Sequence, residues 1–237
     1  MTAYGFFDRS IKRFANRADA GRRLAQALAK YRGQPDLLVL ALPRGGVPVA
    51  WEVARFLGAP LDILLVRKLG LPQQSELAMG AIASGGIRIL NHDLIRQLRI
   101  PEHVIERTVR AEEAEMERRL QAYDGRRGRP ELAGRTVILV DDGVATGATI
   151  LAAAKAIRLQ HPATLVIAVP VCAEPTLALL RAAADDVVCV FEPAYLEAVG
   201  FWYDDFGQTT DAEVRLLLDA AGRADFAMTH SAEGDLP

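Results

Sequence analysis

The chain has 237 residues, with 28 Lys and Arg against 30 Asp and Glu, which leaves a formal charge of −2 at pH 7. Hydrophobic residues make up 51% and charged residues 24%, proportions typical of a folded globular protein and not of a mainly disordered chain. The charge balance argues against a nucleic-acid binder that depends on net positive charge, so nucleic acid is not an expected partner. No apolar run approaches the ~18 residues that a membrane span needs, so no membrane association is expected either.

The two cysteines, Cys172 and Cys189, are too few for a disulfide scaffold in a chain of this length. Both lie in apolar runs, where a cysteine usually behaves as a small buried hydrophobe. Residues 1–13 are rich in Phe but lack the continuous apolar stretch of a signal peptide. We therefore expect a cytoplasmic protein.

Apolar runs of strand length alternate along the chain with segments of helical period. The runs are continuous, which is typical of strands that helices cover on both faces of a parallel sheet. The predicted strands are 37–41, 61–66, 137–140, 165–169 and 187–191. The predicted helices are 18–31, 49–57, 150–160 and 175–184. This alternation predicts an α/β fold with an open, mainly parallel sheet and helices on both faces.

Two segments interrupt the alternation. Residues 78–83 and 87–90 predict a hairpin that turns at Ser84, Gly85 and Gly86. Residues 101–123 predict a long charged helix with a narrow apolar stripe, in which Glu and Arg side chains pair at helical spacings. That helix is either solvated and crossed by weak ion pairs or used for interaction. We expect one domain over 1–222, with a core over about 37–190 and a polar tail over 223–237.

The most informative segment is 136–149, in which an apolar strand ends in Asp141 and Asp142 and a loop of small residues leads into a helix. In open α/β sheets, ligands bind beyond the carboxyl ends of the strands. A loop that enters a helix N-terminus presents unpaired N–H groups, which suit a phosphate, and Thr146 and Thr149 add hydroxyl donors. The acids are then placed to accept hydrogen bonds from the vicinal hydroxyls of a sugar. The alternative is a threonine that caps the helix beside solvated acids.

Residues 137–149 resemble the phosphoribosyl-pyrophosphate (PRPP) signature of the type I phosphoribosyltransferases: four apolar residues, two acids and a loop ending Thr-Gly-x-Thr. The resemblance implies that Asp141 and Asp142 bind the ribose 2′ and 3′ hydroxyls. It also implies that they contact the cofactor Mg²⁺ indirectly, through the ribose and water. The residues that it assigns to the 5′-phosphate are Ala145, Thr146, Gly147, Ala148 and Thr149.

A second loop, 42–48, follows the first predicted strand and reads Leu-Pro-Arg-Gly-Gly-Val-Pro. Arg44 offers a fork of donors for phosphate oxygens, and Gly45 and Gly46 permit unusual backbone angles. Taken alone, the loop is equally an ordinary strand-to-helix turn with a surface arginine. In family terms it is similar to the pyrophosphate loop, with Arg44 on the diphosphate, and such loops often contain a cis peptide bond that is not followed by proline.

Two basic residues, Arg67 and Lys68, end the second predicted strand and are either solvated or functional. The resemblance implies that they contact the diphosphate and open a mobile lid over 69–86, which carries Glu76. Such a lid excludes water, which otherwise competes as the nucleophile. Arg44, Lys68 and Glu76 are the expected catalytic residues.

The variable region that binds the acceptor in this family, the hood, corresponds here to 191–206 together with N-terminal residues. Phe191 or Trp202 is expected to stack on a flat acceptor, and Asp204 or Asp205 to hydrogen-bond its edge. The alternative is an aromatic cluster that seals the edge of the sheet. The purine enzymes carry an acid where this chain has Ala145, and a Lys in the stretch that corresponds to 169–173, which has none here. The resemblance therefore does not imply a purine acceptor.

The whole chain is similar to a group of bacterial phosphoribosyltransferase-like proteins of unassigned substrate, which share the loop 42–48, the segment 66–70 and the run 201–206. The implied reaction transfers the 5-phosphoribosyl group from PRPP to a small, nitrogenous-base acceptor with release of pyrophosphate. A regulatory protein that senses PRPP or nucleotides without turnover is the alternative, and hydrolysis of phosphorylated sugars is a third. Homodimers are common among similar proteins.

Overall fold

The computed structural model describes residues 13–71, 74–124 and 130–232, with the backbone alone at 74–77, 124 and 224–232. Five parallel strands form the central sheet in the order β2-β1-β6-β7-β8. These strands are β1 (Leu37–Ala41), β2 (Leu61–Ile63), β6 (Thr136–Val140), β7 (Thr164–Val171) and β8 (Asp186–Phe191). The predicted parallel α/β sheet is confirmed.

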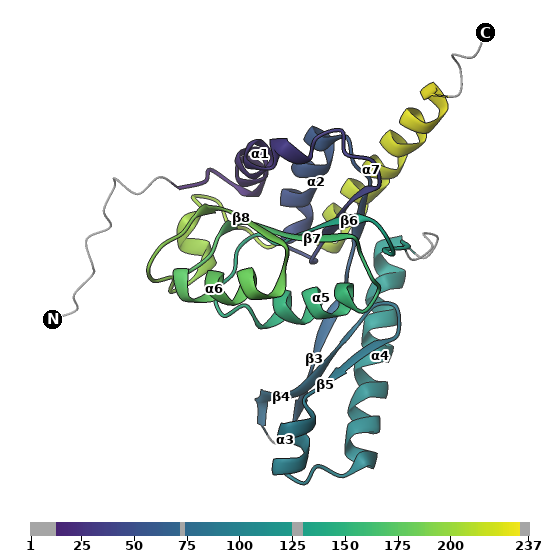
Figure 1. Ribbon diagram of the computed structural model, residues 1–237, viewed down its shortest axis with the longest axis vertical. Helices are drawn as coiled ribbons and strands as arrows, with labels where there is room; N and C mark the ends of the chain where they lie inside the picture. Colours follow the sequence, from purple (N-terminus) through teal and green to yellow (C-terminus); the bar gives the residue numbers. More distant parts are fainter. Residues whose placement is uncertain (1–12, 72–73, 125–129, 233–237) are drawn as a thin grey trace, which may run out of the picture.

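Helices cover both faces of this sheet (Figure 1). One face carries α1 (Arg17–Ala27), α2 (Gly46–Leu57) and α7 (Asp211–Ala232), and the other carries α5 (Ala148–Arg158) and α6 (Glu174–Ala183). Alternate residues of β1 pack into different cores: Val39 joins the helices of the first face, while Leu38 and Leu40 join those of the second. Because both faces are covered, every residue of β1 is buried, which explains the continuous apolar runs.

A second sheet projects from the first as an arm (Figure 1). It contains three antiparallel strands, β3 (Val66–Leu71), β4 (Gln74–Ala83) and β5 (Ile87–Leu90), followed by α3 (His92–Gln97) and α4 (Glu102–Asp124). The predicted hairpin is confirmed as β4 and β5, with Gly85 and Gly86 at positive φ in its turn. The predicted strand 61–66 is wrong in its extent, because the parallel strand ends at Ile63 and Val66 begins the antiparallel sheet.

Helix α4 packs along the arm through a narrow stripe of buried side chains, formed by Ile105, Val109, Met116 and Tyr123. Its charges were expected to pair within the helix, and Glu115 does pair with Arg118 and Arg119. Other acids reach the arm sheet instead: Glu112 pairs with Arg67, and Arg88 binds Glu106 at 3.2 Å and Glu113 at 3.0 Å. The charged helix is thus tied to the hairpin as well as solvated.

The segment at 13–16 lies beside residues 202–205. Phe14 and Tyr203 form an isolated parallel bridge, and the Phe14 amide donates to the Trp202 carbonyl at 2.9 Å. The chain also forms two short 3-10 helices: η1 (Ala29–Tyr31) follows α1, and η2 (Val199–Trp202) leads into Tyr203. Helix α7 continues to Ala232, beyond the position at which the sequence predicted a polar tail to begin.

Both cysteines are free thiols; Cys172 is buried and Cys189 partly buried. Within the described ranges, no helix combines the length and apolar character needed to cross a lipid bilayer.

Candidate functional site

The candidate site lies where the carboxyl ends of β1 and β6 meet, because these two parallel strands are neighbours in the sheet. Loop 42–46 follows β1 and loop 141–147 follows β6. The two loops are in close contact: a Cβ added to Gly45 would lie 2.0 Å from Asp142 Oδ2, and one added to Gly46 would lie 2.8 Å from the Val140 carbonyl oxygen. Only glycine fits at these two positions. The peptide bond between Pro43 and Arg44 is cis, in the loop where the resemblance led us to look for such a bond.

The side chains of Asp141 and Asp142 are largely buried at this junction, and Asp142 is 15% exposed. The backbone N–H of Asp142 donates to Asp141 Oδ1 at 2.9 Å. Burial raises the pKa of Asp141 well above its ordinary value, and the negative charge of Asp142 raises it further. Burial also raises the pKa of Asp142, although the Arg17 guanidinium opposes this shift. The structure therefore brings two acids together in a place that disfavours their charged forms.

Arg17, which the sequence analysis did not single out, is the cation beside this pair. Its Nε lies 2.8 Å from Asp142 Oδ2, and its Nη1 donates to the Gly207 carbonyl at 2.6 Å. The Tyr203 hydroxyl donates to the Asp142 carbonyl, and burial raises the pKa of Tyr203, so that this hydroxyl keeps its proton. Arg17 precedes Asp142 by 125 positions, so no local spacing in the sequence links them.

The predicted phosphate loop leads directly into α5. Gly147 has φ +80°, and a Cβ there would lie 2.9 Å from Thr176 Cγ2, so both backbone angle and space require glycine. The Thr176 hydroxyl donates to the Ala145 carbonyl at 2.7 Å and holds the loop from α6. Gly147 is the N-cap of α5 and no side chain in the described structure caps this helix, so the alternative of a threonine cap does not hold. Thr146, Ala148 and Thr149 are exposed at the start of the helix.

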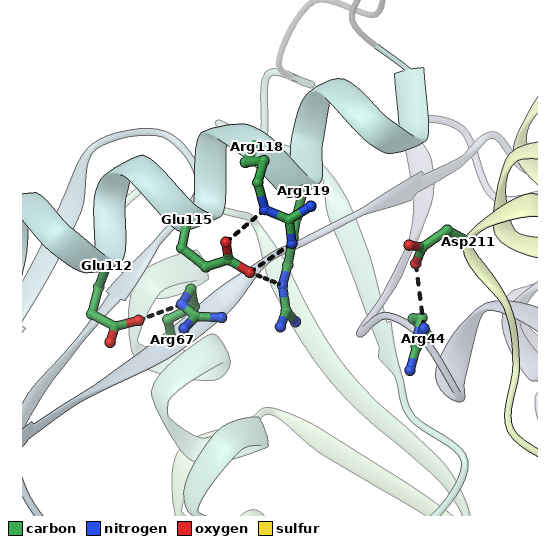
Figure 2. A network of polar contacts seen from close by, with 7 residues as sticks. All are labelled: Arg44, Arg67, Glu112, Glu115, Arg118, Arg119 and Asp211. Carbon is green, nitrogen blue, oxygen red and sulfur yellow. Dashed lines mark hydrogen bonds and ion pairs between the residues drawn. The ribbon is translucent and has the colours of Figure 1, made fainter.

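The three cations assigned to the diphosphate point in different directions. Arg44 Nη1 lies 3.5 Å from Asp211 Oδ1 at the start of α7, and Arg67 pairs with Glu112 of α4 (Figure 2). Lys68 lies on the opposite face of β3, as expected for the next residue of a strand. The structure thus separates Arg67 from Lys68, and places a carboxylate beside each of the two arginines.

Lys68 lines a cavity of about 580 Å³ between the arm and α5. The cavity is also lined by Ala148 and Thr149 from the predicted phosphate loop, and by Lys155 further along α5. The cavity therefore lies between the arm, which contains the predicted lid, and the loop predicted to hold phosphate. The side chain of Glu76 lies outside the described residues, so the structure gives it no position.

The predicted acceptor side chains belong to an aromatic cluster. The ring centroids of Phe191 and Trp202 are 5.5 Å apart, those of Phe14 and Phe191 4.9 Å, and those of Tyr203 and Phe206 4.8 Å. Phe191 and Trp202 are partly buried, so part of each ring remains exposed while the rest packs in this cluster. Asp204 and Asp205 are exposed, and Asp205 Oδ1 accepts a hydrogen bond from the Gly207 amide.

Two other aromatic residues are exposed, and the sequence analysis gave neither of them an individual role. Tyr195 is 78% exposed and Phe201 is 47% exposed. Both follow β8 in the chain, in the region that the sequence assigned to the acceptor.

Comparison with known proteins identifies the family. A family model described as "Phosphoribosyl transferase domain" matches residues 9–204. The chain belongs to the phosphoribosyl transferase family. The match includes both loops, the acid pair and most of the hood, so the resemblance inferred from residues 137–149 is confirmed.

Several known proteins are similar to this chain over most of its length. The Mycobacterium tuberculosis proteins named "Putative phosphoribosyl transferase Rv0571c" (strain ATCC 25618 / H37Rv) and "Putative phosphoribosyl transferase MT0597" (strain CDC 1551 / Oshkosh) are each 47% identical over 217 residues, or 92% of this chain. The chain spans about half (48%) of the length of these curated relatives. The crystal structure of TT1426 from Thermus thermophilus is 42% identical, with a TM-score of 0.78 over 87% of this chain and 97% of that one.

Proposed function

We propose that the protein transfers the 5-phosphoribosyl group of PRPP to a small nitrogenous-base acceptor and releases pyrophosphate. The observation that carries this proposal is the junction of the two loops, where Gly45 and Gly46 let the backbone approach Asp141 and Asp142. Acids at this junction and exposed hydroxyls at the start of α5 provide the groups that a phosphorylated sugar requires.

In this proposal the protein mainly positions its substrates. Asp141 and Asp142 accept hydrogen bonds from the ribose hydroxyls. The amides and hydroxyls of residues 145–149 hold the 5′-phosphate at the helix N-terminus. Arg44 turns from Asp211 towards the diphosphate, and Lys68 approaches from the arm, so that both stabilise the negative charge that develops on the leaving group.

Mg²⁺ fits the chemistry of this donor set, because magnesium prefers oxygen ligands and the two carboxylates supply them. Across the described ranges, no group of three or more His, Cys, Asp and Glu side chains is placed to hold a metal ion. Asp141 and Asp142 would hold the ion through the ribose and water, because magnesium usually keeps several of its waters. When bound with the diphosphate, Mg²⁺ neutralises part of its charge.

The arm is proposed to exclude water from the reacting centre. It borders the cavity that Lys68 and Thr149 line, so a movement of the hairpin towards α5 would close this cavity over the phosphate loop. In this proposal Arg67 stabilises the arm and does not bind the diphosphate, because it pairs with Glu112 and keeps β3 attached to α4.

The test is calorimetric titration of the protein with PRPP and Mg²⁺. We expect Asp142→Asn and Arg44→Ala each to weaken binding by at least about tenfold, which corresponds to ~1.4 kcal/mol. Asp219→Asn and Arg22→Ala, which change exposed residues of α7 and α1, serve as matched controls and should bind as the wild type does. Wild-type affinity in both site variants would contradict the proposal.

A second experiment separates transfer from sensing. A PRPP-binding regulator is the other candidate, because Arg67 faces α4 and Ala145 stands in the phosphate loop, which leaves the site short of cations and of an acid–base group. The protein is incubated with PRPP, Mg²⁺ and a mixture of bases, and mass spectrometry follows pyrophosphate and new nucleotides. A nucleotide product supports transfer; tight binding without any product favours the regulator.

A further inference from the structure

Arg17 occupies a position that its own helix fixes. Helix α1 begins at Arg17 because Asn16 caps it: Asn16 Oδ1 accepts the Asp19 amide at 2.9 Å. The Arg17 side chain is only 12% exposed, although it carries a charge. A largely buried guanidinium needs partners for its donors. The identity of these partners indicates what the residue does.

The guanidinium bridges two parts of the candidate site. Its Nε contacts Asp142 Oδ2 at 2.8 Å, which holds one oxygen of an acid assigned to the ribose. Its Nη1 donates to the Gly207 carbonyl at 2.6 Å, and its Cζ lies 3.9 Å from the centre of the Phe206 ring. The last two contacts are with residues 202–207, which we call the acceptor segment because it contains Trp202, Asp204 and Asp205.

The acceptor segment is fastened to the same acid a second time. The Tyr203 hydroxyl donates to the Asp142 carbonyl, and the Tyr203 ring packs on Phe206. Backbone hydrogen bonds also tie this segment to the strand that precedes α1: Asp204 N donates to the Phe14 carbonyl at 2.8 Å and Asp205 N to the Ala15 carbonyl at 3.0 Å. A shift of Asp142 is therefore transmitted to the acceptor segment through two side chains.

We infer that Arg17 is a positioning residue that orients the Asp142 carboxylate and couples occupation of the ribose site to the placement of the acceptor segment. This inference rests on the proposed function. Holding Oδ2 fixes the plane of the carboxylate, and with it the direction in which Oδ1 faces a sugar. The planar fork of an arginine reaches both Asp142 and Gly207, whereas a lysine ammonium is a single point of charge and cannot span the two.

The neighbouring arginine of α1 provides the matched control. Arg22 is 53% exposed, and its contacts with Asp19 and Glu52 are both 3.8 Å long. Arg22→Ala removes the same kind of side chain from the same helix without touching the site.

The experiment uses Trp202 as the reporter. The chain has two tryptophans, so Trp51→Phe leaves only Trp202, which belongs to the acceptor segment and packs against Phe191. In this background, PRPP with Mg²⁺ is titrated into the Arg17→Ala, Arg17→Lys and Arg22→Ala variants while calorimetry gives the affinity and Trp202 fluorescence reports on the acceptor segment. Melting temperatures show whether each variant is folded.

We expect Arg17→Ala to bind PRPP at least tenfold more weakly and to lose the Trp202 response. Arg17→Lys keeps a positive charge beside Asp142 and should recover affinity to within about threefold, without recovering the Trp202 response. If Arg17→Ala does not fold, Arg17→Lys decides the matter: loss of its Trp202 response supports the coupling and a retained response overturns it.

The outcomes separate this inference from the function on which it rests. If the parent protein does not bind PRPP, the proposed function fails and the coupling fails with it. If the parent binds PRPP, and Arg17→Ala has a lower melting temperature but the parent's affinity and fluorescence response, Arg17 serves only the fold and the inference alone is overturned.

Discussion

At the scale of single residues, burial of the acid pair Asp141 and Asp142 opposes folding of this molecule. Asp141 and Asp142 are adjacent in the chain and largely buried, and burial raises the pKa of both. A buried carboxylate disfavours its charged form, so folding at neutral pH must either neutralise this pair or bury its charge. Buried acids that reduce stability at the end of a core strand are typical of a binding site.

The first prediction concerns this loss of stability. Asp141→Asn removes the ionisation but keeps an oxygen that can accept the Asp142 amide, so we expect a higher melting temperature than that of the wild type at pH 7 to 8. The sign follows from the raised pKa. In the unfolded chain Asp141 ionises near its ordinary value of about 3.9, so the wild type loses stability as the pH rises from there towards the folded pKa.

Below about pH 3.9, Asp141 is protonated in the folded and in the unfolded protein, so the higher stability of Asp141→Asn should disappear there. Thermal melts at several pH values measure this, with Asp219→Asn on the exposed face of α7 as the control. A variant less stable than the wild type at neutral pH would show that the Asp141 charge is stabilised by groups other than those described.

Residues of the site differ in how far the sequence reveals them. The strand that ends in Asp141, the loop and the helix that follows occupy one short segment, so local patterns predict them together. Arg17 and Asp211 come to the site only through the order of the strands and the packing of α1 and α7, and neither has a local motif. The sequence also placed Arg67 and Lys68 together, whereas alternation along β3 puts their side chains on opposite faces.

At the scale of elements, α4 shows that a charge pattern in the sequence does not reveal which residues a helix pairs with in the folded protein. The sequence predicted its extent and its apolar stripe. It paired the acids with arginines of the same helix. It could not show that Glu112 faces Arg67 of β3, or that Glu106 and Glu113 face Arg88 of β5, because these pairings depend on how the arm sheet packs against α4.

The second prediction tests what stabilises α4. Met116 is 5% exposed within the stripe, so Met116→Ala should cost about 2–5 kcal/mol of stability. Glu115→Gln, one position away, removes an exposed pairing with Arg118 and Arg119 and should leave stability almost unchanged, because solvent screens these charges. Denaturant unfolding compares the two; an equal loss in both would mean that ion pairs and not the stripe hold this helix.

At the scale of the whole molecule, the central sheet and the arm differ in how completely they are buried. Every residue of β1 is buried, and so is β6 except for Thr136, whereas α3 has no buried residue and β5 is at most partly buried. The sequence predicted the central sheet well because both of its faces are covered and its strands are continuously apolar. The arm strands β3 and β5 are mostly only partly buried, so their apolar pattern is weak and only the hairpin with its glycine turn was found.

The third prediction follows from this difference. Hydrogen exchange followed by mass spectrometry should find the slowest amides in β1 and β6 and much faster exchange in β5 and α3, because local opening costs less where few side chains are buried. PRPP with Mg²⁺ should slow exchange in β3 and β4 if the arm closes over the cavity. Exchange in β5 as slow as that in β6 would contradict the proposed mobility of the arm.

The clasp between Arg17, Asp142, Tyr203 and Gly207 has a consequence for synthesis of the protein. The ribosome delivers Arg17 first, the acid pair more than a hundred residues later and Gly207 last, and domains acquire structure as they emerge. Both loops of the junction can therefore exist on a nascent chain whose residues 202–207 have not yet been made. A polypeptide arrested after α6 would carry the twin carboxylates without Tyr203 and Gly207, and the site would reach its final form only after Gly207 had left the ribosome.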